Sequence, residues 1–351
     1  MTTLNVVLLV VTFLAYLASY INPERAWWAG FMALAIPITL VLNVIFALYW
    51  LVTRPLRALY SVAVLLLGYR FIQATIAFSP QDEDAPPPDF TVMTYNVRAF
   101  NLYHSASSEE MIRWVSQTRA DIVCLQEFYN QNGSDKFSAI ARISHGPLNH
   151  YYFSPWVTTK RKGQFGMAIF STHPIIYQGT LELSKATNNQ IIYADIRLPK
   201  GMVRVYNIHL QSMRISAEEL NLDVSEEEMR KHASSVTDKL RGGFEERGRQ
   251  MRALEESIKT SPYPVLVCGD LNDLPYSHTY YRLNNELQNA FEKAGHGLGV
   301  SYAGNLPFLR IDNQFADQRF NVVGYETFYN AIWSDHYPVK AAYTFKSARE
   351  N

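Results

Sequence analysis

Residues 265–272 read Val-Leu-Val-Cys-Gly-Asp-Leu-Asn, a run of four apolar residues that leads through a glycine into two polar side chains. The apolar residues predict a short buried strand. Asp270 and Asn272 follow it two residues apart, which puts both side chains on one side of an extended segment. The stretch therefore predicts a strand whose end presents a carboxylate and an amide.

Other apolar runs within residues 90–345 end in the same way, in carboxylate, amide or imidazole side chains. The residues collected at these ends are Asn96, Glu127, Asn207, His209, Asp270, Asn272, Asp312, Asp335 and His336. One such residue means little, but their recurrence is the pattern expected when several strands converge on one polar site. Helical stretches at 108–118 and within 216–260 separate the predicted strands, which indicates an α/β or α+β fold with sheets in its core.

The residue types at these strand ends favour one kind of chemistry. Carboxylate and amide oxygens suit Mg²⁺, Mn²⁺ or Ca²⁺ rather than zinc, and the chain has only two cysteines. Acids beside histidines suit phosphoryl chemistry, which needs a cation, a base for water and donors to the phosphate oxygens. The sequence contains no Gly-x-x-x-x-Gly-Lys-Ser/Thr loop, no Gly-x-Ser-x-Gly elbow and no His-Glu-x-x-His helix.

Seven short motifs, in order along residues 90–345, resemble those of the endonuclease/exonuclease/phosphatase superfamily. This superfamily includes pancreatic-type deoxyribonucleases, abasic-site endonucleases, neutral sphingomyelinases and inositol polyphosphate 5-phosphatases. The motifs are Thr94-Tyr95-Asn96, Leu125-Gln126-Glu127, Gly166-Met167-Ala168-Ile169, Asn207-Ile208-His209-Leu210, Gly269-Asp270-Leu271-Asn272-Asp273, Arg310-Ile311-Asp312 and Ser334-Asp335-His336-Tyr337-Pro338-Val339. The resemblance covers none of residues 1–89.

The resemblance implies a four-layer α/β sandwich, in which two mixed β-sheets face each other with helices outside. It also implies a metal-dependent hydrolase that acts on phosphate-ester bonds, with Mg²⁺ as the expected ion and Mn²⁺ as the alternative. By the same resemblance Glu127 is the principal metal ligand, and Asn96 lies beside the metal. Asp335 completes the metal shell or a second metal position.

The resemblance assigns the catalytic roles as well. Asp270 orients or deprotonates the attacking water, and Asn272 donates to a phosphate oxygen. His336, oriented by Asp312, contacts the phosphate and takes part in acid–base chemistry. His209 is a second phosphate contact or the acid on the leaving-group side.

The first 81 residues differ sharply from the rest, because they contain only five charged side chains. These are Glu24, Arg25, Arg54, Arg57 and Arg70. Apolar runs cover residues 4–21, 26–53 and 58–78, and about 20 apolar residues suffice for a helix to cross a bilayer. We expect a transmembrane region over residues 1–80 with three helices, at about 4–21, 26–52 and 58–78. Arg70 within the third run either snorkels, pairs with a partner or marks a functional site.

Two further segments complete the predicted organisation. Residues 81–89 form an acidic, proline-rich linker, and residues 90–351 form the catalytic domain. The turn at 53–57 carries two arginines and no acid, whereas the linker carries four acids and no base. The positive-inside rule then puts the N-terminus in the cytoplasm. We expect an integral, multi-pass membrane protein with an extracytoplasmic catalytic domain.

The leading functional prediction is a membrane-anchored, Mg²⁺-dependent phosphoesterase, most simply a phosphodiesterase or nuclease-like hydrolase. Its partners would be the bilayer, through residues 1–80, and a nucleic acid, a phospholipid or a small phosphate ester. Lys and Arg total 32, as do Asp and Glu, so its affinity does not rest on a global positive charge. A sphingomyelinase-like enzyme or an inositol or sugar phosphatase is the alternative. A catalytically inactive, membrane-tethered binding protein is the alternative from another class.

Overall fold

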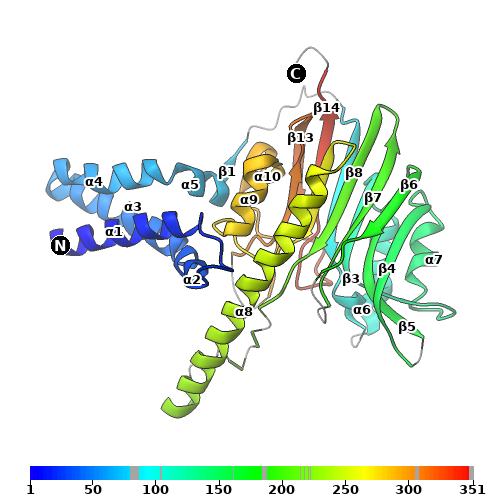
Figure 1. Ribbon diagram of the computed structural model, residues 1–351, viewed down its shortest axis with the longest axis horizontal. Coiled ribbons are helices and arrows are strands. Elements are labelled where there is room, and N and C mark those ends of the chain that lie inside the picture. The colour runs from blue at the N-terminus through cyan, green and yellow to red at the C-terminus, as the bar shows by residue number, and fades with distance from the viewer. Residues whose placement is uncertain are drawn as a thin grey trace. The chain divides into compact units, whose positions relative to one another are not determined.

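The computed structural model divides the chain into two compact units (Figure 1). It describes residues 1–79, 87–102, 105–160, 162–183, 188–213, 215–216, 218–219, 221, 223–304 and 308–347. The helical unit comprises residues 1–76, 211–249 and 273–282, and the sandwich unit comprises 77–210, 250–272 and 283–351. Most of the predicted linker, residues 80–86, lies outside the described residues.

The first 76 residues form five helices, where the sequence predicted three. They are α1 (Thr2–Ala18), α2 (Trp28–Leu34), α3 (Ile36–Thr53), α4 (Pro55–Leu67) and α5 (Tyr69–Thr75). The predicted span at 26–52 is divided at Ala35, since Pro37 in the first turn of α3 has no N–H to continue α2. The predicted span at 58–78 is bent by 67° at Gly68, between α4 and α5.

Membrane-length helices are fewer than predicted within the described residues. Only α3, with 18 residues, is long and apolar enough by itself to cross a bilayer. The bent pair α4–α5 would be a second span if its two helices act as one, and α1 is slightly shorter, with 17 residues.

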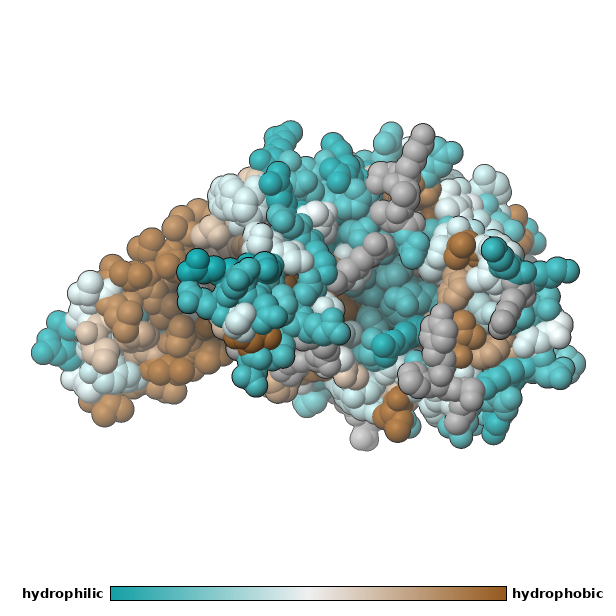
Figure 2. Space-filling model, turned by 90° about the horizontal axis from the view of Figure 1, so that it is seen from below, coloured by the Kyte–Doolittle hydropathy of each residue, from teal (hydrophilic) through white to brown (hydrophobic). Residues whose placement is uncertain are grey.

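The bundle of α1, α3 and α4 buries several polar side chains beside apolar ones such as Leu40 and Val64, and its outside is apolar. In its interior Asn5 Nδ2 donates to Ser61 Oγ at 3.0 Å, Trp50 Nε1 donates to Asn5 Oδ1 at 3.0 Å, and Asn43 Nδ2 donates to Thr12 Oγ1 at 2.9 Å. Its exposed apolar side chains include Leu4, Val7, Val10, Val41, Ile45, Leu48 and Leu59. Figure 2 shows this apolar surface in brown over the bundle.

Two later segments belong to the helical unit, although the sequence assigned them to the catalytic domain. They are residues 211–249, which include the first part of α8 (Glu226–Lys259), and residues 273–282, which include the start of α9 (His278–Glu286). Aromatic contacts attach them to the first helices. The rings of Phe31 and Phe244 lie 5.4 Å apart, and those of Tyr20 and Tyr281 lie 4.4 Å apart.

The sandwich unit contains two six-stranded mixed sheets. One has the strand order β13-β14-β2-β3-β5-β4 and the other β10-β12-β9-β8-β7-β6. The first comprises β13 (Phe320–Thr327), β14 (Val339–Phe345), β2 (Phe90–Asn96), β3 (Ile122–Gln131), β5 (Gly163–Ser171) and β4 (His150–Thr158). The second comprises β10 (Gln288–Asn289), β12 (Asp312–Ala316), β9 (Val265–Asp270), β8 (Gly201–His209), β7 (Gln190–Leu198) and β6 (Ile175–Thr180). A two-stranded ribbon pairs β1 (Ala77–Phe78) with β11 (His296–Gly297).

The layers of the sandwich follow from the alternation of side chains along each strand. On β2, Phe90 and Val92 face the core between the sheets, while Met93 and Tyr95 face the helix α6. The remaining helices are η1 (Arg98–Asn101), α6 (Ser105–Ser116), α7 (Ala139–Ser144) and α10 (Ala290–Ala294). Figure 1 shows α6 and α7 against the outer side of one sheet. The predicted α/β fold with two mixed sheets is confirmed.

Candidate active site

Each sheet holds one parallel strand pair, and the candidate residues lie at the carboxyl ends of these pairs. In one sheet β2 runs parallel to β3, and in the other β8 runs parallel to β9. Asn96 is the last residue of β2, while His209 and Asp270 end β8 and β9 as register partners. Because the carboxyl ends of parallel strands share one edge of a sheet, β2, β8 and β9 bring their polar ends to this place, and β3 adds Glu127 from within the strand.

A β-bulge presents Glu127 at this edge. The pairing of β3 with β5 shifts between Leu125 and Phe128, and Glu127 in the bulge has a φ of 49°. Bulges beside active sites commonly redirect a side chain in this way. The side chain of Glu127 is 40% exposed, whereas Asp270 is 1% exposed. Glu127 is therefore the carboxylate at this edge that solvent reaches most freely.

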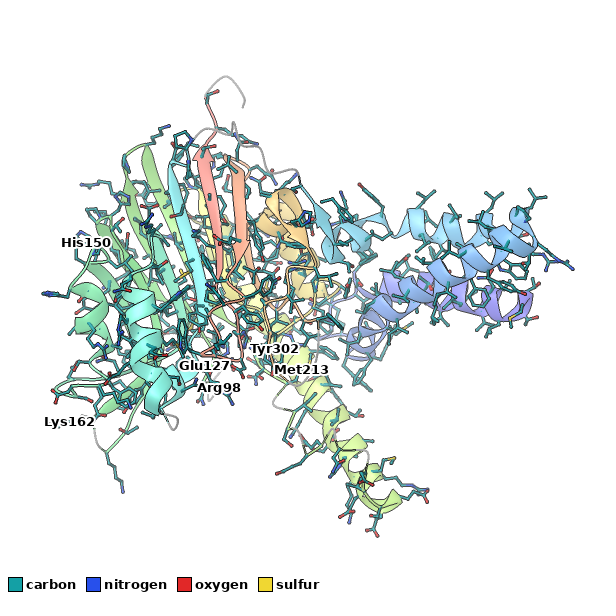
Figure 3. All side chains as sticks on the ribbon, turned by 180° about the vertical axis from the view of Figure 1, so that it is seen from behind. Arg98, Glu127, His150, Lys162, Met213 and Tyr302 are labelled. Carbon is teal, nitrogen blue, oxygen red and sulfur yellow. The ribbon has the colours of Figure 1, made fainter. Side chains whose placement is uncertain are left out.

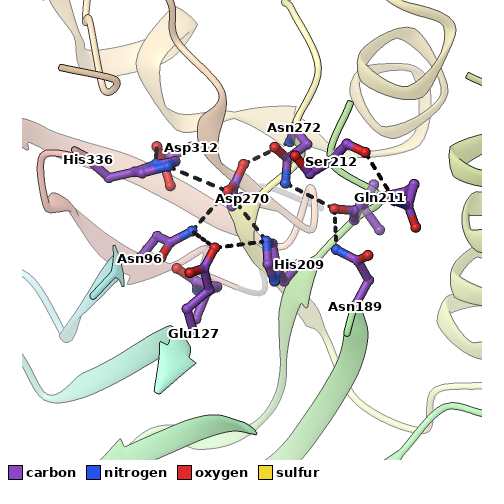
Figure 4. Close-up of polar contacts among 12 residues, drawn as sticks. Asn96, Glu127, Asn189, His209, Gln211, Ser212, Asp270, Asn272, Asp312 and His336 are labelled. Atoms are coloured by element: carbon purple, nitrogen blue, oxygen red, sulfur yellow. Dashed lines mark hydrogen bonds and ion pairs between the residues drawn. The ribbon is translucent and has the colours of Figure 1, made fainter. Parts of the chain in front are cut away.

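Asn96, His209 and the two carboxylates form the centre of the site (Figure 4). Asn96 Nδ2 donates to Asp270 Oδ2 at 3.1 Å and to Glu127 Oε1 at 3.3 Å. His209 Nε2 lies 3.7 Å from Glu127 Oε1 and 3.8 Å from Asp270 Oδ2. One amide and one imidazole thus lie between a buried carboxylate and a half-exposed one.

His336 and Asp312 form a buried acid–base pair. His336 Nδ1 lies 2.8 Å from Asp312 Oδ2, and His336 Nε2 lies 3.8 Å from Asp270 Oδ2. Burial alone lowers the pKa of His336, but the Asp312 and Asp270 carboxylates outweigh it and raise that pKa to about 10. His336 is therefore a cation at neutral pH, with its Nε2–H directed toward Asp270.

Asp270 is held by its neighbours. Its Oδ1 accepts a hydrogen bond from the backbone N–H of Asn272 at 2.8 Å. Burial raises the pKa of Asp270 above its usual range, and the positive charge of His336 opposes this in part. A carboxylate with a raised pKa is a better proton acceptor than a solvated one. Asn272, with a φ of 50°, donates through Nδ2 to the carbonyl of Leu210 at 3.0 Å.

Asp335 lies at the rim of the site. Its Oδ2 lies 3.6 Å from Arg98 Nε, and its side chain is 27% exposed. Ser334 connects it to the centre, because Ser334 Oγ donates to the carbonyl of Asn96 at 2.8 Å. Figure 3 shows Arg98 and Glu127 at the same end of the sheets, with Tyr302 nearby. The ring of Tyr302 meets that of His336 edge-on, at 5.1 Å.

Left-handed backbone is concentrated around the site. Eight non-glycine residues have positive φ in the described part of the chain. Six of them are Arg98, Ala99, Phe100, Asn101, Glu127 and Asn272. Such conformations cost about 1–3 kcal/mol each and persist where the surroundings determine them, most often at functional sites. Here Asn96 Oδ1 accepts from the N–H of Arg98 at 3.1 Å, and buried Phe100 packs on Phe128 with ring centroids 5.3 Å apart.

A buried amide network behind the site was not predicted as such. Asn207 Nδ2 donates to the carbonyls of Leu125 at 3.0 Å and Ala168 at 2.9 Å, and Asn207 Oδ1 accepts from Gln126 Nε2 at 2.6 Å. These bonds join the two sheets directly behind Glu127 and His209. The sequence collected Asn207 among the strand-end residues, but only its place between the sheets reveals the role.

Asn189 is a second residue that sequence reasoning missed. Its Nδ2 donates to the carbonyl of Leu210 at 2.7 Å, on the same oxygen that Asn272 binds. It lies directly before β7. No sequence signal of the kind used for the other residues points to it.

One group of acids and histidines among the described residues could hold a metal ion. Asp270, Asp312 and His336 offer ligand atoms that all lie within 4.8 Å of one another. However, His336 Nδ1 and Asp312 Oδ2 are already bound to each other. Glu127 is the most accessible carboxylate of the site and offers oxygens of the kind that a hard cation prefers. Asn96 directs its Nδ2 toward Glu127 Oε1 and its Oδ1 toward the N–H of Arg98.

Comparison with known proteins agrees with this geometry. Residues 93–336 match the model of the endonuclease/exonuclease/phosphatase family, and residues 1–75 match a domain of unknown function, DUF8431. No curated protein matches the chain. An endonuclease/exonuclease/phosphatase from Beutenbergia cavernae shares 17% identity at a TM-score of 0.53, over 74% of this chain and 72% of that one.

Two further solved structures have the same fold. A family protein from Leptotrichia buccalis shares 14% identity at a TM-score of 0.53, over 73% of this chain and 100% of its own. A functionally unknown protein from Enterococcus faecalis shares 15% identity at the same TM-score, again over 73% and 100%. These likenesses show the fold alone, whereas the family match spans most of the chain and all the candidate residues. The chain belongs to the endonuclease/exonuclease/phosphatase family of phosphoesterase hydrolases.

Proposed function

We propose that this protein is a membrane-anchored, divalent-metal-dependent phosphoesterase, with phosphodiesters as its first candidate substrates. The observation that carries the proposal is the convergence of Asn96, Glu127, His209, Asp270 and His336 at one edge of two sheets. The Nε2 atoms of His209 and His336 each lie 3.8 Å from Asp270 Oδ2, so one small group beside these atoms, a water or a phosphate oxygen, could contact them together. Both imidazoles and the Asn96 amide are donors to such an oxygen.

The protonation states suggest a division of labour. Asp270 orients and deprotonates the attacking water, since its pKa is raised and its Oδ2 faces the centre of the site. His336, held as a cation by Asp312, stabilises negative charge on the phosphate. His209 is positioned by Glu127 and Asp270 to donate on the leaving-group side. Asn272 fixes the chain beside Asp270 and offers its amide to the phosphate.

Glu127, Asn96 and Asp335 would hold the metal in this proposal. When bound, Mg²⁺ or Mn²⁺ would neutralise charge on the phosphate oxygens as a Lewis acid. The chain's own contribution is to hold the ligands ready, since Asn96 is fixed by its bonds to Arg98, Glu127 and Asp270. Removal of the ion with a chelator should abolish turnover, and added Mg²⁺ or Mn²⁺ should restore it.

The bundle of α1, α3 and α4 supports the membrane anchor. A soluble helix bundle exposes mainly polar residues, whereas this one exposes leucine, valine and isoleucine and buries asparagine, threonine and serine beside its apolar core. Small polar residues that hydrogen-bond between helices are typical of helix packing in lipid. Carbonate extraction of membranes that contain the full chain tests this directly: an anchored chain stays in the pellet.

The ends of the bundle support the predicted orientation. Arg57, in the first turn of α4, hydrogen-bonds the hydroxyl of Thr2, so the N-terminus and the arginine-containing junction of α3 with α4 share one end of the bundle. The positive-inside rule puts that end in the cytoplasm. We infer an extracytoplasmic sandwich unit. Protease protection in sealed vesicles of known orientation checks this inference. An extracytoplasmic sandwich unit is cleaved when the extracytoplasmic face of the vesicle is outside and protected when the cytoplasmic face is outside. The reverse result would put the sandwich unit in the cytoplasm.

The experiment that tests the catalytic proposal uses the full chain in detergent micelles. It is assayed with Mg²⁺, Mn²⁺, Ca²⁺ or chelator on bis-p-nitrophenyl phosphate, single- and double-stranded DNA, RNA, sphingomyelin, and inositol and sugar phosphates. Metal-dependent turnover that is lost in Glu127→Gln supports the proposal and identifies the substrate class. Binding of one class without turnover, unchanged by Glu127→Gln, would instead identify a binding protein.

A further inference from the structure

Arg247 is a charged side chain in an unusual place. It lies on α8 with an exposure of 0%, and it is the largest fully buried side chain in the described part of the protein. Arg247 Nε bonds Asp273 Oδ2 at 3.0 Å, and Nη1 donates to the backbone carbonyl of Gln211 at 2.8 Å. The guanidinium lies 5.3 Å from the ring centroid of Phe244. One guanidinium therefore binds two chain segments that are far apart in sequence.

These two segments are continuous with the strands that end in the candidate site. Gln211 follows Leu210 on the extension of β8, and Asp273 follows Asn272 on the extension of β9. The backbone ladder of the two strands ends at the pair His209 and Asp270. Beyond it, side-chain bonds and single backbone bonds join the two extensions in the described part of the chain, so their spacing depends on particular residues.

The described contacts form a series along the two extensions. The N–H of Leu210 donates to the carbonyl of Asp270 at 3.0 Å, and Asn272 Nδ2 donates to the carbonyl of Leu210 at 3.0 Å. One residue further along, Arg247 bridges Gln211 and Asp273. Each contact fixes the register that the backbone ladder no longer fixes. Arg247 is the last bridge of the series described here.

We propose that Arg247 is a positioning residue for the catalytic strand ends. By fixing Gln211 against Asp273, it holds the extensions of β8 and β9 in register and keeps Asp270 and His209 at their working separation. It also stabilises the left-handed conformation of Asn272, the residue before Asp273. The inference rests on the proposed phosphoesterase function for its kinetic consequence, but its structural consequence does not depend on that function.

The chemistry of arginine explains why this residue type occupies the position. A guanidinium presents several donors in a rigid plane, so one side chain can bind a carboxylate and a carbonyl at fixed angles. A lysine offers a single point charge on a flexible stem. A buried ion pair is also weak evidence for stability, because desolvation offsets much of the attraction. Geometry is therefore the better account of Arg247 than stability.

The test compares variants of the full chain in micelles. Arg247→Met keeps a long, unbranched side chain and removes both bonds, whereas Arg247→Lys keeps the charge but lacks the planar fork that holds the two partners at fixed angles. Arg249→Gln is the matched control, because Arg249 lies two residues away on the same helix and has a 45% exposed side chain paired with Glu246. For each variant, kcat and KM are measured on the best substrate, together with hydrogen exchange of individual peptides.

We expect Arg247→Met to lower kcat by about 10²-fold, the typical cost of misplacing a catalytic group by about 1 Å. KM should change by less than about 3-fold, since binding contacts remain. Amides in peptides covering 208–212 and 269–274 should exchange faster, while those of β2 should not. Arg247→Lys should show an intermediate loss, and Arg249→Gln should match the wild type.

Several outcomes would overturn the positioning role. One is an Arg247→Met variant whose kcat and amide hydrogen exchange equal those of the wild type. Another is faster hydrogen exchange throughout that variant, which would mean that Arg247 stabilises the whole fold. If Arg247→Met does not fold, Arg247→Lys decides in its place, and wild-type kcat in that variant excludes the role. If the wild type hydrolyses nothing, the proposed function fails. Hydrogen exchange of the amides in 208–212 and 269–274 then still tests whether Arg247 holds the two extensions together.

Discussion

Buried asparagine side chains have different surroundings in the helical bundle and in the β-sandwich. Asn43 in the bundle and Asn207 in the sandwich are both fully buried. Asn43 lies among polar residues inside a bundle whose outside is apolar, and its amide joins helix to helix. Asn207 lies in an otherwise apolar core and joins sheet to sheet directly behind the candidate site. The first pattern suits a protein surrounded by lipid, and the second suits one surrounded by water.

The comparison separates buried polar side chains that hold helices or sheets together from polar side chains that could take part in a reaction. In the bundle, the buried amides of Asn5 and Asn43 donate to side chains of neighbouring helices. In the sandwich, other buried polar side chains such as Gln314 also join the two sheets, but the carboxylates and imidazoles of the candidate site gather at one edge. There Asp270 Oδ2 and His336 Nε2, both buried, lie 3.8 Å apart. The predictions below test this contrast.

The largest effect is expected at the edge of the sandwich. Asp270→Asn keeps the shape of the side chain and removes the proposed base, so kcat should fall by about 10³-fold or more. The melting temperature should change little, because the groups at this edge serve the reaction more than the fold. Steady-state kinetics and thermal unfolding measure the two properties.

Asp317→Asn is the matched control for Asp270→Asn. Asp317 follows β12 at the opposite end of the sheet, where its carboxylate pairs with exposed Arg319. It should keep wild-type kcat. Equal losses in the two variants would mean that the edge has no special chemistry.

A second prediction concerns the apolar outside of the bundle. Ile45→Lys places a charge at the middle of α3, on a side chain that is 54% exposed. If lipid surrounds the bundle, this should cost about 3 kcal/mol of insertion free energy. Val52→Lys, near the end of α3 on an 87% exposed side chain, should cost far less because lysine there can snorkel. The fraction of each variant retained in carbonate-washed membranes measures the difference, and equal retention would argue for a water-exposed bundle.

The smallest effects come from the two asparagines themselves. Asn207→Leu leaves two buried carbonyls and the Gln126 amide without their partner, and should destabilise the sandwich unit by about 3 kcal/mol. Asn43→Leu should cost about 1 kcal/mol or less, since hydrogen bonds between helices in lipid contribute little on average. Denaturant unfolding of the full chain in micelles, followed separately for each unit by hydrogen exchange, compares them. A larger loss for Asn43→Leu would reverse the comparison.

Much of the sandwich could be predicted from the sequence, because a buried strand records its environment in a continuous apolar run. The run that leads to Asp270 is of this kind, whereas those that lead to Asn96 and His209 alternate apolar with polar residues, and the structure has strands at all three. The ends of those strands carry the candidate residues, so the sequence also predicted which residues meet. It could not predict the bulge at Glu127 or the turn at Arg98, because both depend on backbone conformations imposed by packing.

The bundle was harder to predict. Hydropathy detects an apolar run but not a break within it, so the division at Ala35 and the bend at Gly68 came from the structure. The sequence also gave no sign that residues 211–249 and 273–282 belong with the first helices, since that depends on contacts such as Phe31 with Phe244. Arg247 was missed for the same reason, because an arginine in a polar helix reads as a solvated residue.

The position of β14 has a consequence for the synthesis of the protein. This strand, near the end of the chain, lies between β13 and β2 and pairs with β2 from Val339 opposite Thr94 to Tyr343 opposite Phe90. The helices of residues 1–76 therefore leave the ribosome long before β14 is available to pair with β2 and complete the first sheet. Pairing of such distant segments is slow compared with helix formation. Under the proposed membrane anchoring, a nascent chain would therefore insert its first helices before the candidate site is assembled, and an interrupted chain that lacks His336 and β14 should be inert.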